Sequence, residues 1–235
     1  MFDNLSGRFI DQFVTGDGLD LMMKGLVITI EISAIALIIG IAIGMLMALL
    51  KIAKGKTKAG KIFCTIGNVI AKIYISFFRG TPVVVQLLLA YFGIFGPLGV
   101  NPLYVGFCVL GCNSGAYVAE IIRGGIQSID KGQYEAGRSL GLPYRATMFR
   151  IIIPQAIKNI LPALGNELIA LIKETSVVGF ISVFDMTRAA RSIISTHYDA
   201  LVPYLVLAGA YLLIVLVATF LVGRLERGLS KSDRG

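Results

Sequence analysis

Long apolar runs constrain the fold of this chain more than any other feature of its sequence. The first run covers residues 21–50, which exceeds the about 20 residues that a helix needs to cross the apolar core of a bilayer. A second apolar segment, residues 62–96, is interrupted at residues 79–82, where Pro82 cannot continue a helix. Three more runs cover residues 103–129, 151–172 and 203–222. The pattern predicts an all-α integral membrane protein, a helical bundle with five spans.

The composition argues against a soluble domain and against a nucleic-acid-binding protein. Hydrophobic residues make up 56% of the chain and charged residues 15%, with a mean hydropathy of +0.80. A soluble domain has about 45–50% apolar and about 25% charged residues. The formal net charge of +8 comes from basic residues in short segments that flank the apolar runs, which is typical of a membrane protein. We expect no nucleic-acid partner, and the N-terminus shows no pattern of a removable signal peptide.

The distribution of charge predicts the orientation of the spans. Basic residues follow the first and the last apolar run: Lys51, Lys54, Lys56, Lys58 and Lys61, then Arg224, Arg227, Lys231 and Arg234. Both segments are therefore expected on the cytoplasmic side. We divide the chain into an acidic outer arm at residues 1–20, a transmembrane domain at residues 21–228 and a basic cytoplasmic tail at residues 229–235. Five spans then place the N-terminus outside and the C-terminus inside.

The loop at residues 130–154 is a polar interruption with helix signals of its own. Asp130 is a candidate N-cap, with Gln133 three residues later in the position of a capping box. Gly141 supplies a left-handed stop, and Pro143 follows where the helix cannot continue. These signals predict a short helix from Lys131 to Leu140. The five-span topology places it on the cytoplasmic side.

This loop resembles the EAA loop of importer-type ABC transporter permeases. The positions of the family pattern are occupied here by Glu135, Ala136, Gly137, Gly141, Ile151, Ile153 and Pro154. It departs from the family at Gly137, where the second alanine is expected, and at Ile153, where leucine is expected. Residues 77–88, 115–129 and 162–176 resemble the polar amino acid subfamily. The resemblance covers most of residues 20–225.

The resemblance implies the permease subunit of an ATP-driven importer of polar amino acids in the bacterial cytoplasmic membrane. It implies three partners: a cytoplasmic ABC ATPase dimer, an extracytoplasmic solute-binding protein, and a second permease chain of the same or a homologous kind. ATP and Mg²⁺ would be bound by the ATPase, and no cofactor is expected in this chain. The residues implied in coupling to the ATPase are Glu135, Ala136, Gly137, Arg138, Ser139 and Gly141.

The sequence contains no pattern for catalysis or for energy supply. It has no phosphate-binding loop of the G-x-x-x-x-G-K-[ST] type, so the chain is not expected to bind ATP or to act as an enzyme. The odd count of cysteines (Cys64, Cys108 and Cys112) argues against a disulfide framework, and we expect packing thiols and no metal site. Two alternatives remain: an ion-driven secondary transporter, which would need a second copy of the broken segment, and a structural membrane protein without cargo.

Four polar residues in the spans are candidate cargo ligands. Glu167 and Glu174 lie two turns apart on one face of the fourth span, where two carboxylates are costly unless a charge offsets them. Either Lys173 pairs with one of them, or both attract a cationic cargo such as arginine, lysine or histidine. Asn113 hydrogen-bonds either a neighbouring helix or the cargo, and Thr81 either lines the pathway or belongs to a plain kink.

Overall fold

The computed structural model describes residues 4–52 and 57–231, and no strand occurs among them. The regular helices are α1 (Leu5–Phe9), α2 (Gly18–Ile52), α3 (Lys58–Gly80), α4 (Val83–Ala90), α5 (Pro102–Gln127), α6 (Lys131–Ser139), α7 (Tyr144–Thr147), α8 (Ile153–Glu174), α9 (Met186–His197) and α10 (Leu201–Lys231). Short π-helical segments at Ile10–Thr15, Tyr91–Phe95 and Met148–Ile152 and a 3-10 helix at Thr175–Ile181 extend them. The all-helical architecture is as predicted.

Four of the described helices are long and apolar enough to cross a membrane: α2, α3, α5 and residues 201–229 of α10. The fifth expected span appears as α8, which is amphipathic, with Asn159, Asn166 and Lys173 exposed along one side. Because of these polar side chains, α8 is not among the described helices that are apolar enough to cross a membrane. Five crossings therefore stay a prediction. The second expected span begins at Lys58, and α3 is long enough to cross without α4.

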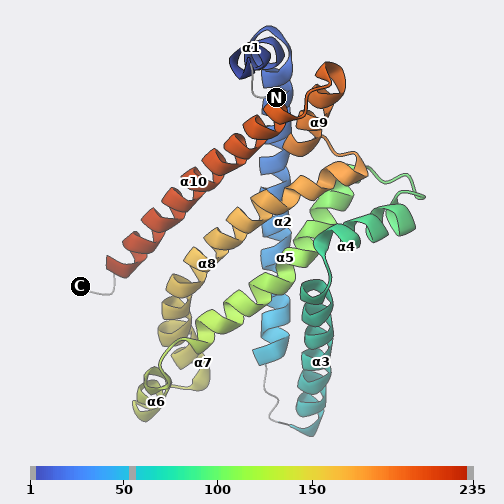
Figure 1. The fold of residues 1–235 in the computed structure, drawn as a ribbon. Helices are drawn as coiled ribbons and strands as arrows, with labels where there is room; N and C mark the ends of the chain where they lie inside the picture. The colour runs from blue at the N-terminus through green and yellow to red at the C-terminus, as the bar shows by residue number, and fades with distance from the viewer. Residues whose placement is uncertain (1–3, 53–56, 232–235) are drawn as a thin grey trace.

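Small residues let α2 and α5 pack closely along the centre of the molecule (Figure 1). A Cβ atom added at Gly44 would lie 2.6 Å from Val118, and one added at Gly111 would lie 2.6 Å from Ile39. Such contacts favour glycine, because a branched side chain of the neighbouring helix already occupies the space that a Cβ atom would need. The G-x-x-x-G pair Gly40 and Gly44 therefore serves packing within this chain.

The N-terminal arm folds against α9 and α10. Arg8 donates a hydrogen bond to Asp199, Gln12 donates another at 2.8 Å, and Phe13 is buried among residues of α9 and α10. Burial alone would raise the pKa of Asp199, but the hydrogen bonds from Arg8 and Gln12 outweigh it and lower that pKa. The arm is shorter than expected, since α2 begins at Gly18.

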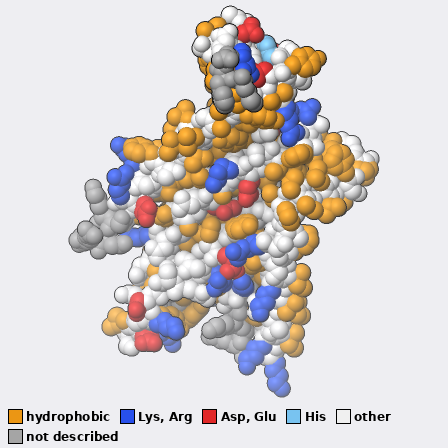
Figure 2. All heavy atoms as spheres, in the orientation of Figure 1, with side chains coloured by type: hydrophobic (Ala, Val, Ile, Leu, Met, Phe, Trp, Pro, Cys, Tyr) orange, Lys and Arg blue, Asp and Glu red, His pale blue; other side chains and the backbone are white. Residues whose placement is uncertain are grey.

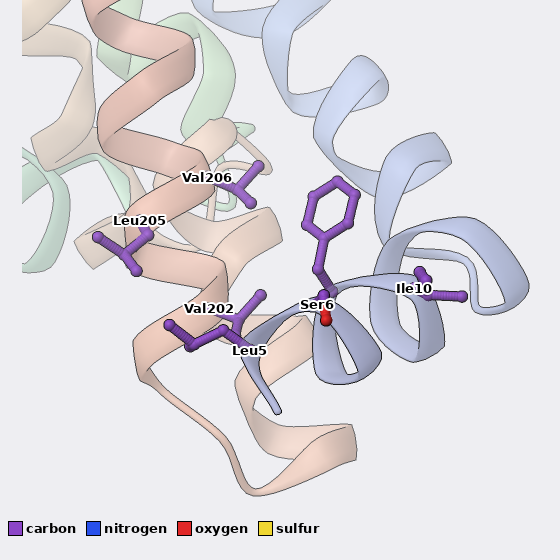
Figure 3. A pocket seen from close by; sticks show the side chains of 7 residues that line it. Leu5, Ser6, Ile10, Val202, Leu205 and Val206 are labelled. Atoms are coloured by element: carbon purple, nitrogen blue, oxygen red, sulfur yellow. The ribbon is translucent and has the colours of Figure 1, made fainter. Parts of the chain in front are cut away.

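Figure 3 shows an apolar pocket between the arm and the start of α10. Leu5, Phe9, Val202 and Val206 are among the side chains that line it, and the hydroxyl of Ser6 is the one side-chain polar group there. A pocket of this chemistry does not suit a charged amino acid.

The arm and α9 lie at one end of the molecule, and α6 lies at the other end (Figure 1). The last turn of α2 and the first turn of α3, which carry Lys51, Lys58 and Lys61, lie toward the end with α6. The lysine-bearing turns and α6 therefore share one end, opposite to the arm, and the side of the membrane that each end faces stays a prediction. Phe2, Lys54, Lys56 and Arg234, together with the last residues of the expected basic tail, lie outside the described residues.

Candidate functional site

One face of α5 holds a carboxylate that comes from α8. Ser114 is fully buried on α5, and its hydroxyl donates a hydrogen bond of 2.7 Å to Oε1 of Glu167. Glu167 is half-buried, and so is Glu174 two turns further along α8. Each carboxylate keeps part of its surface open, so each is able to meet a ligand.

One turn after Ser114 on α5, Tyr117 contacts a cationic side chain that comes from α3. The guanidinium carbon of Arg79 lies 5.2 Å from the centre of the Tyr117 ring, in the geometry of a cation–π contact. Ser114 and Tyr117 are three residues apart on α5, so Arg79 and Glu167 flank the same helical face. Figure 2 shows acidic and basic side chains together in the middle of one face of the molecule.

The prediction omitted Arg79, although the sequence contained a signal for it. An arginine next to a helix break inside an apolar segment is costly unless it faces protein or water. Thr81 was the candidate predicted in that segment, and Arg79 lies two residues before it.

Asn113 and Thr81 hold the break between α3 and α4 together. The amide nitrogen of Asn113 donates to the Phe78 carbonyl at 3.1 Å and to Oε1 of Gln86 at 3.0 Å. The amide of Gln86 donates in turn to the carbonyl oxygens of Phe78 and Thr81, at 3.0 Å each, and to the Thr81 hydroxyl at 2.8 Å. Asn113 is 3% exposed. These bonds satisfy carbonyl groups that the helix break leaves open, which favours the structural alternative for both residues.

Lys173 forms no salt bridge with Glu167 or Glu174 among the residues that the structure describes. Its side chain is exposed, next to Glu174 in sequence. No salt bridge in that part of the chain therefore supports the pairing alternative for these carboxylates, and their role stays a prediction.

An ion network joins α2 to α5 toward the end that carries α6. Glu120 accepts from Lys51 at 2.5 Å through Oε1 and from Arg123 at 2.6 Å through Oε2. Arg123 also donates to Gln127 at 2.5 Å. Because each charge has an opposite partner, the network is a structural tie between the two helices.

The loop after α5 forms the predicted short helix, α6, with both caps in place. The carboxylate of Asp130 accepts from the Gly132 N–H at 2.6 Å. Gly141 has φ +80°, and Leu142 donates to the Gly137 carbonyl while Gly141 donates to that of Arg138. This pair of bonds is a Schellman motif, which needs the left-handed residue that glycine supplies.

The candidate coupling residues divide between an exposed and a buried side of α6. Glu135, Ala136, Arg138 and Ser139 are exposed, and Arg138 donates to the Leu142 carbonyl. Gly137 is buried, and an added Cβ would lie 2.8 Å from Thr147. The departure from the EAA pattern at Gly137 thus has a packing reason.

A groove of about 560 Å³ lies beside α6. The end of α5 and the segment before α8 form its walls, and the lining includes Ile126, Tyr134, Glu135, Met148 and Ile152. Its mix of apolar and charged side chains suits a protein surface better than a small ligand.

Comparison with known proteins gives consistent matches. Residues 40–231 match the family model described as "Binding-protein-dependent transport system inner membrane component". The arginine transport system permease protein ArtQ of Bacillus subtilis (strain 168) is 38% identical over 95% of this chain and 99% of its own. The glutamine transport system permease protein GlnP of Escherichia coli (strain K12) is 38% identical over 88% of this chain and 92% of its own.

Solved structures agree in fold. A crystal structure described as an amino acid ABC transporter with histidines matches with a TM-score of 0.80 at 42% identity, covering 89% of this chain and 94% of the other. An inward-facing MetNI methionine ABC transporter matches with a TM-score of 0.75 at 17% identity, covering 90% of this chain and 97% of the other. The second match supports the fold alone.

Proposed function

The chain belongs to the family of binding-protein-dependent transport system inner membrane components, and from this premise we propose that it forms the pathway of an ATP-driven amino acid importer. The observation that carries the proposal is the placement of Arg79 and Glu167 on one face of α5. An α-amino acid presents a carboxylate and an ammonium group, and this face offers a charge of opposite sign to each.

Each charged group has a role that its chemistry supports. The guanidinium of Arg79 suits the cargo carboxylate, because its planar fork donates two parallel hydrogen bonds. Glu167, oriented by Ser114, suits a cationic group of the cargo. Glu174 adds a second carboxylate, which favours arginine, lysine or histidine over an acidic amino acid. The relatives named for arginine and for glutamine transport support the amino acid class.

We assign the supply of energy to a cytoplasmic ABC ATPase dimer that binds ATP and Mg²⁺. Its contact surface on this chain is the exposed side of α6, with Glu135, Ala136, Arg138 and Ser139. The groove beside α6 is open at the same end of the molecule and can accept part of the ATPase. Gly137 and Gly141 act indirectly, by fixing the shape of the helix.

The remaining partners follow from the two ends and the polar side of the molecule. An extracytoplasmic solute-binding protein would meet the end with the arm and α9. A second permease chain would cover the exposed polar side of α8, which includes Asn166 and Lys173. The membrane is a bacterial cytoplasmic membrane, with the N-terminus outside and the C-terminus in the cytoplasm.

The test is uptake of radiolabelled arginine into liposomes that contain the full transporter. We expect Glu167→Gln and Glu174→Gln each to raise the KM for arginine about tenfold or more, which corresponds to about 1.4 kcal/mol of lost interaction. Basal ATP hydrolysis and assembly with the ATPase should remain near the wild-type level. Glu226→Gln, which removes an exposed carboxylate from α10, is the matched control. A wild-type KM in the double glutamine variant would contradict the cargo role of both residues.

A further inference from the structure

A polar stripe runs along α3, although α3 is one of the helices able to cross the membrane. Its members are separated by four, three, four, four and three residues: Lys61, Thr65, Asn68, Lys72, Ser76 and Arg79. With 3.6 residues per turn, this spacing places all six on one narrow face of the helix. Asn68 is half-buried and the other five are exposed. A stripe of this kind is not expected on a helix surrounded by lipid.

The rest of the surface of α3 is apolar. Phe63, Ile66, Ile70 and Ile73 are 51–71% exposed and lie on the side turned away from the stripe. Gly67, Ala71 and Ile75 are buried against the molecule. The helix therefore has three distinct sides: one suits lipid, one packs inside the chain, and one is polar.

Lys72 is the charged member of the stripe that lies away from both ends of α3. It lies 14 residues after Lys58, the first residue of α3, which is about 21 Å along the helix axis. Among the described residues, no carboxylate lies within salt-bridge distance of its ammonium group. An exposed ammonium at this depth is costly in lipid, so it requires water or a polar partner.

The stripe ends at the candidate cargo site. Its last member, Arg79, contacts Tyr117 on α5, one turn from the serine that holds Glu167. From there the stripe descends toward the end with α6, where Lys61 lies in the first turn of α3. One continuous polar surface thus connects the site to that end of the molecule.

We propose that this stripe lines the water-filled exit of the transport pathway, and that Lys72 is a second station for the carboxylate of the amino acid after it leaves Arg79. The inference rests on the proposed function. The ammonium of Lys72 attracts the carboxylate that every α-amino acid carries, whatever its side chain. Thr65, Asn68 and Ser76 keep the surface hydrated without binding the cargo tightly.

The first test measures water access and does not depend on cargo. Cys64, Cys108 and Cys112 are replaced by serine, and single cysteines are introduced at Thr65 and Ser76 of the stripe. Ile66→Cys and Ile73→Cys, on the lipid side of the same turns, are the matched controls. Inside-out vesicles that contain the full transporter are treated with an anionic methanethiosulfonate reagent.

We expect the two stripe positions to react about tenfold or more faster than the controls, because a thiol in lipid rarely ionises to the reactive thiolate. Equal reaction rates at all four positions, or no reaction at the two stripe positions, would contradict the proposal that the stripe lines a water-filled exit. The result stands apart from the cargo site: if the Glu167 and Glu174 variants keep a wild-type KM while the stripe reacts, the cargo assignment fails and the water-filled passage remains.

The second test addresses Lys72 itself. Lys72→Gln should lower the maximal rate of arginine uptake several-fold, because the cargo carboxylate loses its cationic partner. Lys72→Glu should lower it further, because a carboxylate there holds the cationic groups of arginine and slows its release. Basal ATP hydrolysis should not change. Arg227→Gln, which removes an exposed positive charge from α10, is the control. A wild-type rate of arginine uptake in Lys72→Glu would disprove the proposal that Lys72 binds the cargo carboxylate in the exit.

Discussion

At the scale of single residues, the break between α3 and α4 depends on two amide side chains. Asn113 and Gln86 donate to the carbonyl oxygen of Phe78, and Gln86 also donates to that of Thr81. The helix break leaves both carbonyl groups without a backbone N–H partner. Buried carbonyl groups that lose such donors are costly, by about 1–3 kcal/mol each. We therefore expect Asn113→Ala to lower the thermal unfolding temperature of the detergent-solubilised protein, by an amount similar to Gln86→Ala.

The double variant separates a structural role of Asn113 from binding of the cargo. Because the two amides share one network, its loss of stability should be smaller than the sum of the single losses. Asn159→Ala, which removes a hydrogen bond of 2.9 Å at an exposed site, should have a small effect. An unchanged unfolding temperature in Asn113→Ala, together with a raised KM for arginine, would instead assign Asn113 to the cargo.

At the scale of an element, α6 owes its shape to the residue that ends it. Gly141 has φ +80°, and an added Cβ would meet no atom within 4 Å. A substitution there is penalised by backbone conformation alone, by about 1–2 kcal/mol for an ordinary residue. We expect Gly141→Val to reduce ATP hydrolysis stimulated by the binding protein and to leave membrane insertion intact. Gly141→Asn should retain most of the stimulated ATP hydrolysis, because asparagine tolerates the left-handed region. Equal stimulation in both variants would argue against coupling through α6.

At the scale of the whole molecule, the topology prediction follows from the placement of α6 and the arm at opposite ends. Leu98 is 72% exposed in the loop before α5, and Lys131 is exposed at the start of α6. In the variant without native cysteines, Leu98→Cys should react with a membrane-impermeant reagent in right-side-out vesicles. Lys131→Cys should react in inside-out vesicles, and wild-type residues at both positions give the background. Reaction of Leu98→Cys from the cytoplasmic side alone would refute the five-span topology.

The sequence by itself determined the features that depend on local or periodic signals. Apolar runs predict the ends of α2, α5 and α8 to within a few residues, because burial in a membrane requires such runs whatever their neighbours are. They do not predict that α10 continues to Lys231, or that the second run divides into α3 and α4. Asp130, Gly141 and Pro143 predict α6 and its left-handed end, since caps act within a few residues of the chain. The EAA pattern indicated the family, and the family match confirms it.

Only the tertiary structure decided which distant polar groups meet. Asn113 contacts Phe78 and Gln86 across the packing of α5 on α3 and α4, so no local signal distinguished its structural role from a cargo role. The same holds for Ser114 with Glu167, and for Arg79 with Tyr117. Pairs far apart in the sequence are brought together by helix packing, and helical periodicity specifies which face a residue occupies but not which partner that face will have.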